Sequence, residues 1–451
     1  MILLLSISSL LPGCSGESPS TFETESPSRN NALRAYLENG DNAFDWKAEN
    51  VYSKNGFSVN DLILTSQQWR GYSWKHQLTV IIPDEIEFND ALLFITGGSL
   101  IEGEPNPAGP DEELLEAVIG IASANRAVAA ILRQVPNQPL FGGLHEDALI
   151  SYTFQKYRET KDNSWPLLLP MVKSAVRAMD AVQEYCREEK QLDIGGFTIS
   201  GASKRGWTTW LAGASDSRTR AICPMVIDLL NLSVQMDYQL EAWGDYSPSI
   251  EDYVELGIAQ DASTPDGQEL AEIIDPFAYR DSLQMPKMIF LGTNDEYWPV
   301  DAVKHYIDKM PGENWLHHVP NAPHDLNGGE DAIKSLSGFF GLILAGETPP
   351  SCSWSSSLEE GKAEILISAG RDIEPLEAHL WTAASADRDF RDETWISTRL
   401  NFQDPARIRI SVSLPIQGFR AIYIDLSYPS PNGGKYSVSS RVFLLDPDGI
   451  L

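Results

Sequence analysis

The stretch Ile194-Gly-Gly-Phe-Thr-Ile-Ser-Gly-Ala-Ser-Lys-Arg-Gly206 predicts a strand, a tight turn and a helix in direct succession. The apolar run Phe197 to Ile199 indicates a buried strand, and Trp207 to Ala214 is compatible with a helix. The small residues between them permit strained backbone angles and close contact between strand and helix. A turn of this kind presents a nucleophile, and we therefore predict that Ser203 is the nucleophile.

Strand-like and helix-like segments alternate on both sides of this turn, from Leu62 to about Gly346. The expected strands are 62–66, 77–82, 92–96, 127–132, 197–199, 221–227, 287–291 and 315–319. The expected helices are 112–125, 167–190, 207–214, 300–310 and 329–344. The first two strands are expected to be antiparallel, but the alternation predicts a mostly parallel sheet covered on both faces, with chemistry at its carboxyl edge. Residues 231–281, rich in Tyr, Asp and Trp, interrupt the alternation and predict a lid over that edge.

The chain of 451 residues exceeds one average domain, so two domains are expected. The catalytic domain is expected at 32–346, followed by a linker rich in Pro and Ser at 347–357. Beyond it, 407–414 and 422–426 alternate apolar and polar residues, which predicts half-buried antiparallel strands and a small β-sandwich at 358–451. The net charge of −30 disfavours nucleic-acid binding, which needs clustered Lys and Arg.

The N-terminus resembles an export signal. Met1 to Leu11 is a short apolar run, and Leu11-Pro12-Gly13-Cys14 resembles a bacterial lipoprotein cleavage box with Cys14 as the lipidated residue. Residues 15–31 are rich in Ser, Pro and Glu and predict a tether. No Lys or Arg precedes the apolar run, so an ordinary secretory signal over 1–14 is the alternative. We expect a secreted or bacterial cell-envelope protein (periplasm, outer membrane or cell surface), attached to a membrane if Cys14 carries a lipid.

A serine hydroxyl needs a base to take its proton and an acid to orient that base. In this topology the expected chain order is serine, acid, histidine. His324 lies in a loop directly after the strand 315–319, which places its imidazole at a carboxyl end, and we predict that it is the base. Four other histidines follow Ser203 in less suitable places, on a helix, inside a strand or in the second domain: His305, His317, His318 and His379.

Asp295 is the predicted acid. It follows the strand 287–291 and a glycine, which is the loop position from which such sheets usually supply the orienting carboxylate. Asp228, at the end of the preceding strand, is the alternative acid. Glu296 and Asp301 are weaker candidates, because carboxylates in loops and at helix starts are commonly solvated.

The oxyanion that forms on attack needs two preorganised donors. The backbone N–H of Lys204 is the expected first donor. The second is expected from Gly97 and Gly98, where the backbone can come close, although a simple turn would also account for two glycines. Lys204 and Arg205 also bring two positive charges beside the nucleophile. These charges could stabilise an oxyanion, attract an acidic substrate or pair with carboxylates.

The segment 238–253 could form a substrate pocket, and we take Arg205, Tyr238 and Trp243 as candidate substrate-binding residues. No cluster of His, Asp and Glu has metal-ligand spacing, so neither a metal nor another cofactor is expected. Apart from Cys14 the chain holds three thiols, which allow at most one disulfide: Cys186, Cys223 and Cys352.

Several separated blocks resemble one known family. They are Gly201-Ala-Ser-Lys-Arg-Gly-Trp207, Asp275-Pro-Phe-Ala-Tyr279, Pro286-Lys-Met-Ile-Phe-Leu-Gly-Thr-Asn-Asp295, Val319-Pro-Asn-Ala-Pro-His324, Thr65-Ser-Gln-Gln-Trp69 and the segment Glu146 to Met171. From about residue 30 to the C-terminus the chain resembles the PhoPQ-activated pathogenicity-related protein family. The resemblance implies an exported protein with an α/β-hydrolase fold and a C-terminal β region, and supports Ser203, Asp295 and His324 as matching positions. The elbow alone also resembles that of glucuronoyl esterases, which implies acidic sugar esters.

The sequence thus predicts an exported serine hydrolase that cleaves an ester or an amide through an acyl-enzyme. Expected substrates are small-molecule esters, sugar esters or peptides, and an esterase is weakly favoured over a peptidase. The alternative is a non-catalytic secreted binding or signalling protein on a hydrolase scaffold, because a fold does not guarantee a function. An intact serine, acid and histidine in the expected order favours catalysis.

Overall fold

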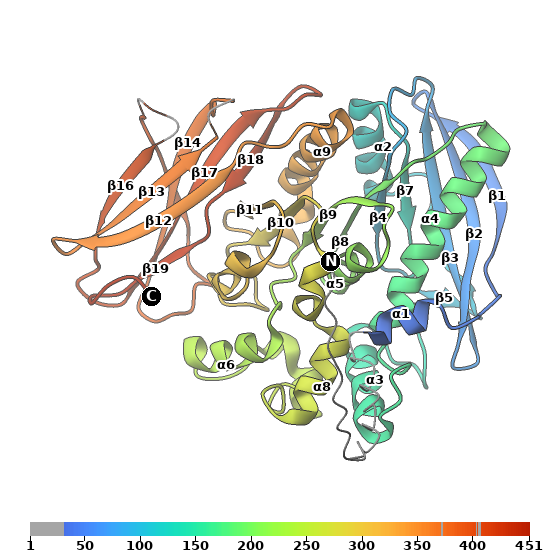
Figure 1. The fold of residues 1–451 in the computed structure, drawn as a ribbon, viewed down its shortest axis with the longest axis horizontal. Helices are drawn as coiled ribbons and strands as arrows, with labels where there is room; N and C mark the ends of the chain where they lie inside the picture. The colour runs from blue at the N-terminus through green and yellow to red at the C-terminus, as the bar shows by residue number, and fades with distance from the viewer. Residues whose placement is uncertain (1–30, 371–372, 403, 405–406) are drawn as a thin grey trace, which may run out of the picture.

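The computed structural model describes residues 31–370, 373–402, 404 and 407–451, and Figure 1 shows their arrangement. The predicted signal segment with Cys14, and all but the last residue of the predicted tether, lie outside the described residues. What is described is an α/β portion, with helices on both faces of a sheet, that continues into a C-terminal β portion.

The α/β portion is built on a mixed sheet. Its strands lie in the order β1 (Asp45–Lys54), β2 (Phe57–Trp69), β3 (Tyr72–Pro83), β7 (Ala129–Leu132), β4 (Ala91–Ile95), β8 (Phe197–Ala202), β9 (Thr219–Met225), β10 (Lys287–Gly292) and β11 (Asn314–Val319). The first three strands are antiparallel and the last six are parallel to one another. The parallel strands form in the middle because both of their faces are apolar, and every residue of β4 is buried. A short hairpin, β5 (Leu100–Ile101) and β6 (Glu104–Pro105), follows β4.

Two hydrophobic clusters fill the two faces of the sheet. The first includes residues of α1 (Ala32–Leu37), α3 (Glu146–Thr160), α4 (Leu168–Lys190) and α5 (Lys204–Ser215). The second includes residues of α2 (Glu113–Asn125) and α9 (Glu330–Ala345). Helix α4 packs because its apolar residues recur every three or four positions, and Val172, Met179 and Val182 are fully buried. Burying one side chain such as Val172 stabilises the fold by about 1.5–3 kcal/mol.

A helical insertion between β9 and β10 occupies the place predicted for a lid. It contains α6 (Leu232–Trp243), α7 (Glu251–Glu255) and α8 (Pro265–Ile274), with short 3₁₀ turns at Pro248–Ile250 and Pro276–Ser282. Figure 1 shows α6 and α8, in green and yellow, beyond the same end of the sheet as α3.

Two local predictions for this portion are wrong. The strand expected at 221–227 ends at Met225, because Val226 has a positive φ of 46° that leaves the extended conformation. The helix expected at 300–310 is instead two 3₁₀ turns, Ala302–His305 and Ile307–Lys309. They are separated at Tyr306, whose φ of −137° is incompatible with a continuous helix.

The C-terminal β portion consists of two antiparallel sheets. One contains β12 (Cys352–Glu359), β13 (Lys362–Ala369) and β16 (Ile408–Ser413). The other contains β18 (Lys435–Ser439), β17 (Phe419–Pro429), β14 (Glu377–Ser385) and β15 (Ile396–Arg399), with β19 (Phe443–Leu445) also paired to β17. This second sheet continues the sheet of the α/β portion, because β18 pairs with β11 through Leu316 and Ser439. The linker expected at 347–357 is shorter, because β12 begins at Cys352 and pairs with β13 as an edge strand.

Strand β16 has the predicted alternation of buried and exposed residues, but β17 does not. Ile422 and Ile424 face the second hydrophobic cluster, while Ala421 and Tyr423 face a third cluster on the opposite side of the strand. The loop 386–395, which joins β14 to β15, supplies Phe390 and Trp395 to that third cluster. The half-buried strand expected at 422–426 is therefore buried on both faces.

Candidate active site

Ser203 lies in a sharp turn between β8, which ends at Ala202, and α5, which begins at Lys204. Its φ of 59° and ψ of −128° are strained for a residue with a side chain. The turn is held by the backbone, since Ser203 N–H donates to the Met225 carbonyl at 2.8 Å. Glycines allow the close approach: a Cβ on Gly201 would lie 2.9 Å from the Ile95 carbonyl, and one on Gly206 would lie 2.8 Å from the Met225 carbonyl. The glycine that lets α5 approach β9 is therefore Gly206, three residues after the serine.

The structure brings His324 and Asp295 together. Each lies in the loop directly after a parallel strand, β11 for the histidine and β10 for the aspartate. His324 Nδ1 is 2.9 Å from Asp295 Oδ2 and 3.0 Å from Oδ1. The neighbouring Glu296 holds the histidine backbone, because its Oε2 accepts from His324 N–H at 3.0 Å.

Asp295 is buried, with only 6% of its side chain exposed. Burial raises its pKa, while the hydrogen bond and charge of His324 and the Tyr297 backbone N–H oppose that rise. The Tyr297 N–H donates to Asp295 Oδ1 at 2.8 Å, which fixes the carboxylate plane. The Tyr297 ring also lies against the imidazole, with ring centroids 4.1 Å apart. The imidazole is thus oriented by contacts on one edge and on one face.

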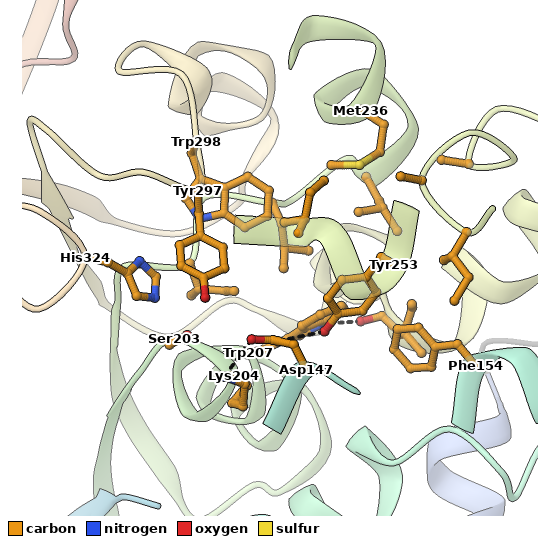
Figure 2. Close-up of a pocket in the computed structure, with 18 residues that line it drawn as sticks. Asp147, Phe154, Ser203, Lys204, Trp207, Met236, Tyr253, Tyr297, Trp298 and His324 are labelled. Carbon is orange, nitrogen blue, oxygen red and sulfur yellow. Dashed lines mark hydrogen bonds and ion pairs between the residues drawn. The ribbon is translucent and has the colours of Figure 1, made fainter. Parts of the chain in front are cut away.

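The other imidazole nitrogen, Nε2, is buried and has no hydrogen-bond partner among the described residues. His324 and Ser203 both line a cavity with about 640 Å³ of empty space. Figure 2 shows the two side chains at the same end of that cavity. A proton acceptor without a partner therefore lies at the end of the cavity that also holds the strained serine.

Asp228, the alternative acid, is buried but is not paired with His324. Its Oδ1 has no hydrogen-bond partner within the described part of the chain. Burial raises the pKa of Asp228 to about 7, the charges of Asp295 and Asp301 add to the rise, and the Tyr306 hydroxyl opposes it. The geometry therefore offers Asp295, rather than Asp228, to the histidine.

The raised pKa of Asp228 predicts a pH-dependent cost to stability. Between its ordinary value of 3.8 and about 7, the folded chain holds a proton on Asp228 that the unfolded chain has lost. The free energy of unfolding therefore falls as the pH rises through this window. We expect Asp228→Asn, which is neutral at every pH, to gain at least about 1 kcal/mol more stability relative to wild type at pH 8 than at pH 5. Thermal unfolding of wild type and variant at both pH values measures this difference. An equal change in stability at both pH values would contradict the prediction.

The remaining candidate acids and bases have other partners. Asp301 accepts from Tyr238 and Lys304, and Glu296 binds the His324 backbone. The other histidines have other contacts: His305 meets the Tyr238 ring edge-on, His317 pairs with Asp331, His318 packs on Tyr423, and His379 lies on β14.

The candidate oxyanion donors lie at the start of α5 and in the loop after β4. Lys204 is the first residue of α5, so its N–H is one of those that have no partner within the helix. Gly97 contacts Arg205, because a Cβ at Gly97 would lie 2.6 Å from the guanidinium. Gly98 has a φ of 138° that favours glycine, and its carbonyl accepts from Gln138 at 3.1 Å.

Two acidic residues that the sequence analysis did not select, Glu146 and Asp147, neutralise the charges beside the serine. Lys204 Nζ lies 2.9 Å from Glu146 Oε2 and 3.2 Å from Asp147 Oδ2. Arg205 binds Glu146 through both terminal nitrogens and donates to the Val135 carbonyl. Burial would raise the pKa of Glu146, but Arg205 and Lys204 lower it to about 2. Of the roles considered for the two cations, pairing with carboxylates is the one that the structure displays. It also places Arg205 against Gly97 rather than in the cavity.

Tyr238 and Trp243 do not line the cavity. Both lie on α6 at its contact with the loop 386–395. The Tyr238 hydroxyl donates to Asp301 at 2.6 Å and accepts from Arg388 at 2.9 Å, and Trp243 lies under Arg391 at 4.1 Å. The aromatic content of 231–281 could not tell a side chain that faces the cavity from one that faces a neighbouring loop.

The loop 386–395 also holds the loops that carry Asp295 and His324. Asn294 Nδ2 donates to three of its backbone carbonyls, at 3.2, 3.2 and 2.7 Å: Phe390, Arg391 and Glu393. Asn321 pairs with the Trp395 backbone at two points: its Nδ2 donates to the carbonyl at 3.0 Å and its Oδ1 accepts from the N–H at 2.7 Å. The C-terminal β portion thus contacts the chain one residue before Asp295 and three residues before His324.

Within the described residues no group of His, Cys, Asp and Glu is arranged to hold a metal ion. In the same residues no helix combines the length and the apolar character needed to cross a bilayer. The three thiols there are free: Cys186, Cys223 and Cys352.

Comparison with known proteins gives a consistent result. Residues 33–391 match the sequence model of the PhoPQ-activated pathogenicity-related protein family. Autocrine proliferation repressor protein A of Dictyostelium discoideum is 32% identical over 433 residues, which cover 88% of this chain and 85% of that protein.

Two solved structures are similar to this chain. Acetyl xylan esterase 1 from a Thermoanaerobacterium species has a TM-score of 0.50 at 13% identity, over 70% of this chain and 94% of that chain. An acetyl xylan esterase from a Paenibacillus species has a TM-score of 0.49 at 14% identity, over 70% of this chain and 95% of that chain. At such identity the likeness shows the fold alone. The predicted α/β-hydrolase fold with C-terminal antiparallel strands is confirmed.

Proposed function

The chain belongs to the PhoPQ-activated pathogenicity-related protein family, and from that premise we propose that it is a serine hydrolase cleaving a carboxylic ester or amide, with esters favoured. One observation carries the proposal. A strained serine, Ser203, shares a cavity with a partly buried imidazole whose Nδ1 is bound to Asp295 and whose Nε2 has no partner within the described residues.

The reaction follows from the roles of these atoms. Ser203 Oγ attacks the substrate carbonyl carbon as His324 Nε2 takes the hydroxyl proton, and Asp295 stabilises the imidazolium through Nδ1–H. The carbonyl electron pair moves to oxygen, where the Lys204 N–H and the Gly97–Gly98 loop supply donors. Collapse of this intermediate expels the alcohol or amine, which takes the proton from Nε2, and leaves an acyl-enzyme. Water then repeats the sequence, releases the acid and restores the serine.

The preference for esters rests on the charges in the cavity. Its two charged side chains, Asp147 and Lys204, pair with each other at 3.2 Å. Neither is left to bind the charged terminus of a peptide, and an unpaired buried charge is costly.

A fluorophosphonate probe tests the proposal, because it reacts only with an activated serine. We expect the wild-type protein to gain the probe mass at one site, mapped to Ser203 by peptide mass spectrometry. Ser203→Ala should remove the label completely. Ser215→Ala, at the last residue of α5, is the matched control and should label normally. Labelling that survives in Ser203→Ala, or an unlabelled folded wild type, would reject the assignment.

A second function is favoured by a single observation, which is the name of the Dictyostelium relative, an autocrine proliferation repressor. That name describes signalling and not catalysis, so a non-catalytic secreted binding protein on the same scaffold is the competing proposal. Silence on both ester and peptide panels, with tight binding to a partner that Ser203→Ala leaves unchanged, would establish it.

We also propose export, on the N-terminal signal described above. The mass of the mature N-terminus distinguishes lipidation at Cys14 from ordinary signal cleavage.

A further inference from the structure

The cavity at Ser203 has apolar walls. Lid residues form one side, and buried residues around α3, β9 and α5 form the other. The main apolar lining residues are Leu232, Met236, Ile250, Ile274, Phe154 and Trp207. The space between these walls, including the part open to solvent, is about 640 Å³.

The charged groups in these walls are already paired, whereas the Trp298 indole N–H has no partner within the described residues. Asp147 accepts from the Tyr253 hydroxyl at 2.9 Å through Oδ1 and pairs with Lys204 through Oδ2. Lys204 also pairs with Glu146 at 2.9 Å. The Trp207 indole N–H donates to the Ile274 carbonyl. A charged group on a substrate would therefore enter this cavity without a counter-charge, which is unfavourable.

The reaction geometry determines which part of the substrate faces the apolar end. The leaving-group oxygen must lie beside His324 Nε2 to receive its proton, so the acyl chain extends away from the imidazole. Figure 2 shows His324 and Ser203 at one end of the cavity, with Met236 and Phe154 well away from the imidazole. The apolar end therefore lies on the acyl side of the scissile bond.

We propose that this cavity is an acyl-binding site for an uncharged, apolar acyl group several carbons long. This inference rests on the proposed function, and it adds the substrate class. Acetyl groups would leave most of the apolar wall unfilled, while longer acyl chains bury one methylene after another against it. Each buried methylene is expected to raise kcat/KM by about fourfold until the cavity is full.

The test keeps the leaving group constant and varies the acyl group. We expect kcat/KM for p-nitrophenyl esters to rise by about 100-fold or more from acetate to hexanoate and then to level off. A p-nitrophenyl monoester of glutaric acid, of similar length but with a terminal carboxylate, should be at least about tenfold poorer than the pentanoate.

A lid variant locates the effect. Met236 is 5% exposed and lines the cavity, so Met236→Trp should shorten the preferred acyl chain and lower kcat/KM for the hexanoate more than for the acetate. Val234→Trp is the matched control, since Val234 lies on the same helix, is 36% exposed and does not line the cavity. Its chain-length profile should be unchanged.

The outcomes separate this inference from the proposed function. If the probe labels Ser203 but kcat/KM is flat or falls with acyl length, or the glutarate monoester is preferred, the acyl site is refuted and the hydrolase stands. If no ester is cleaved and the probe does not react, the proposed function itself fails. If Met236→Trp does not fold, the dependence of wild-type kcat/KM on acyl length still tests the acyl-binding site.

Discussion

Asp295→Asn is expected to lower kcat for an activated ester by about 10³- to 10⁴-fold while changing KM little. The reason lies in the two oxygens of this carboxylate. Oδ1 accepts from the Tyr297 backbone N–H at 2.8 Å, and Oδ2 lies 2.9 Å from His324 Nδ1. An asparagine must keep its oxygen toward Tyr297, so its NH₂ faces Nδ1. The imidazole then carries its proton on Nε2 and cannot accept one from Ser203.

Steady-state kinetics on a p-nitrophenyl ester measure this effect, and a melting curve shows that the variant is folded. Glu296→Gln is the matched control. It removes a charge one residue along the chain, but its side-chain oxygen can still accept from the His324 N–H. We expect the control to stay within about tenfold of wild type. Equal losses of kcat in the two variants would mean that the negative charge near His324, and not the tautomer of its imidazole, determines the rate.

Asn294→Ala is expected to lower kcat by about 10- to 100-fold, although Asn294 does not line the cavity. Its side chain holds three carbonyls of the loop 386–395, and it directly precedes Asp295. Without these bonds the acid loop loses its support from the C-terminal β portion. A displacement of about 1 Å in a catalytic group can cost about 100-fold in rate.

The control for this prediction is Asn432→Ala. Asn432 also ties the C-terminal β portion to the α/β portion, donating to Asn125 Oδ1 at 3.0 Å and to Ser337 O and Oγ at 3.1 and 3.0 Å. It therefore binds α2 and α9 and not the Asp295 or His324 loops. Both variants should lose similar thermal stability, but only Asn294→Ala should lose kcat. If kcat follows stability in both, the loop has no positioning role.

Much of the α/β portion could be predicted because its signals are local. The apolar run before Ser203, the glycines around it and the positions of Asp295 and His324 after apolar strands all follow from short stretches of sequence. Parallel strands bring such loops to one edge, so the two residues lie together although 29 positions separate them.

The rest depends on partners that are distant in sequence. Nothing near Arg205 indicates that Glu146 binds it, and nothing near Tyr238 indicates that Arg388 and Asp301 bind its hydroxyl. The alternation at 422–426 suggested one solvent-facing side, because the loop that covers this side comes about 30 residues earlier. An alternation of apolar and polar residues predicts a strand, but it does not predict what packs on the strand.

The junction of β18 with β11 has a consequence for how the protein can be divided. β11 lies between β10 and β18, and His318 N–H donates to Ser439 Oγ across that junction. A fragment cut before Cys352 would turn β11, an interior strand, into an unpaired edge strand. Such a fragment would be prone to self-association through that edge, so its inactivity would say little about Ser203.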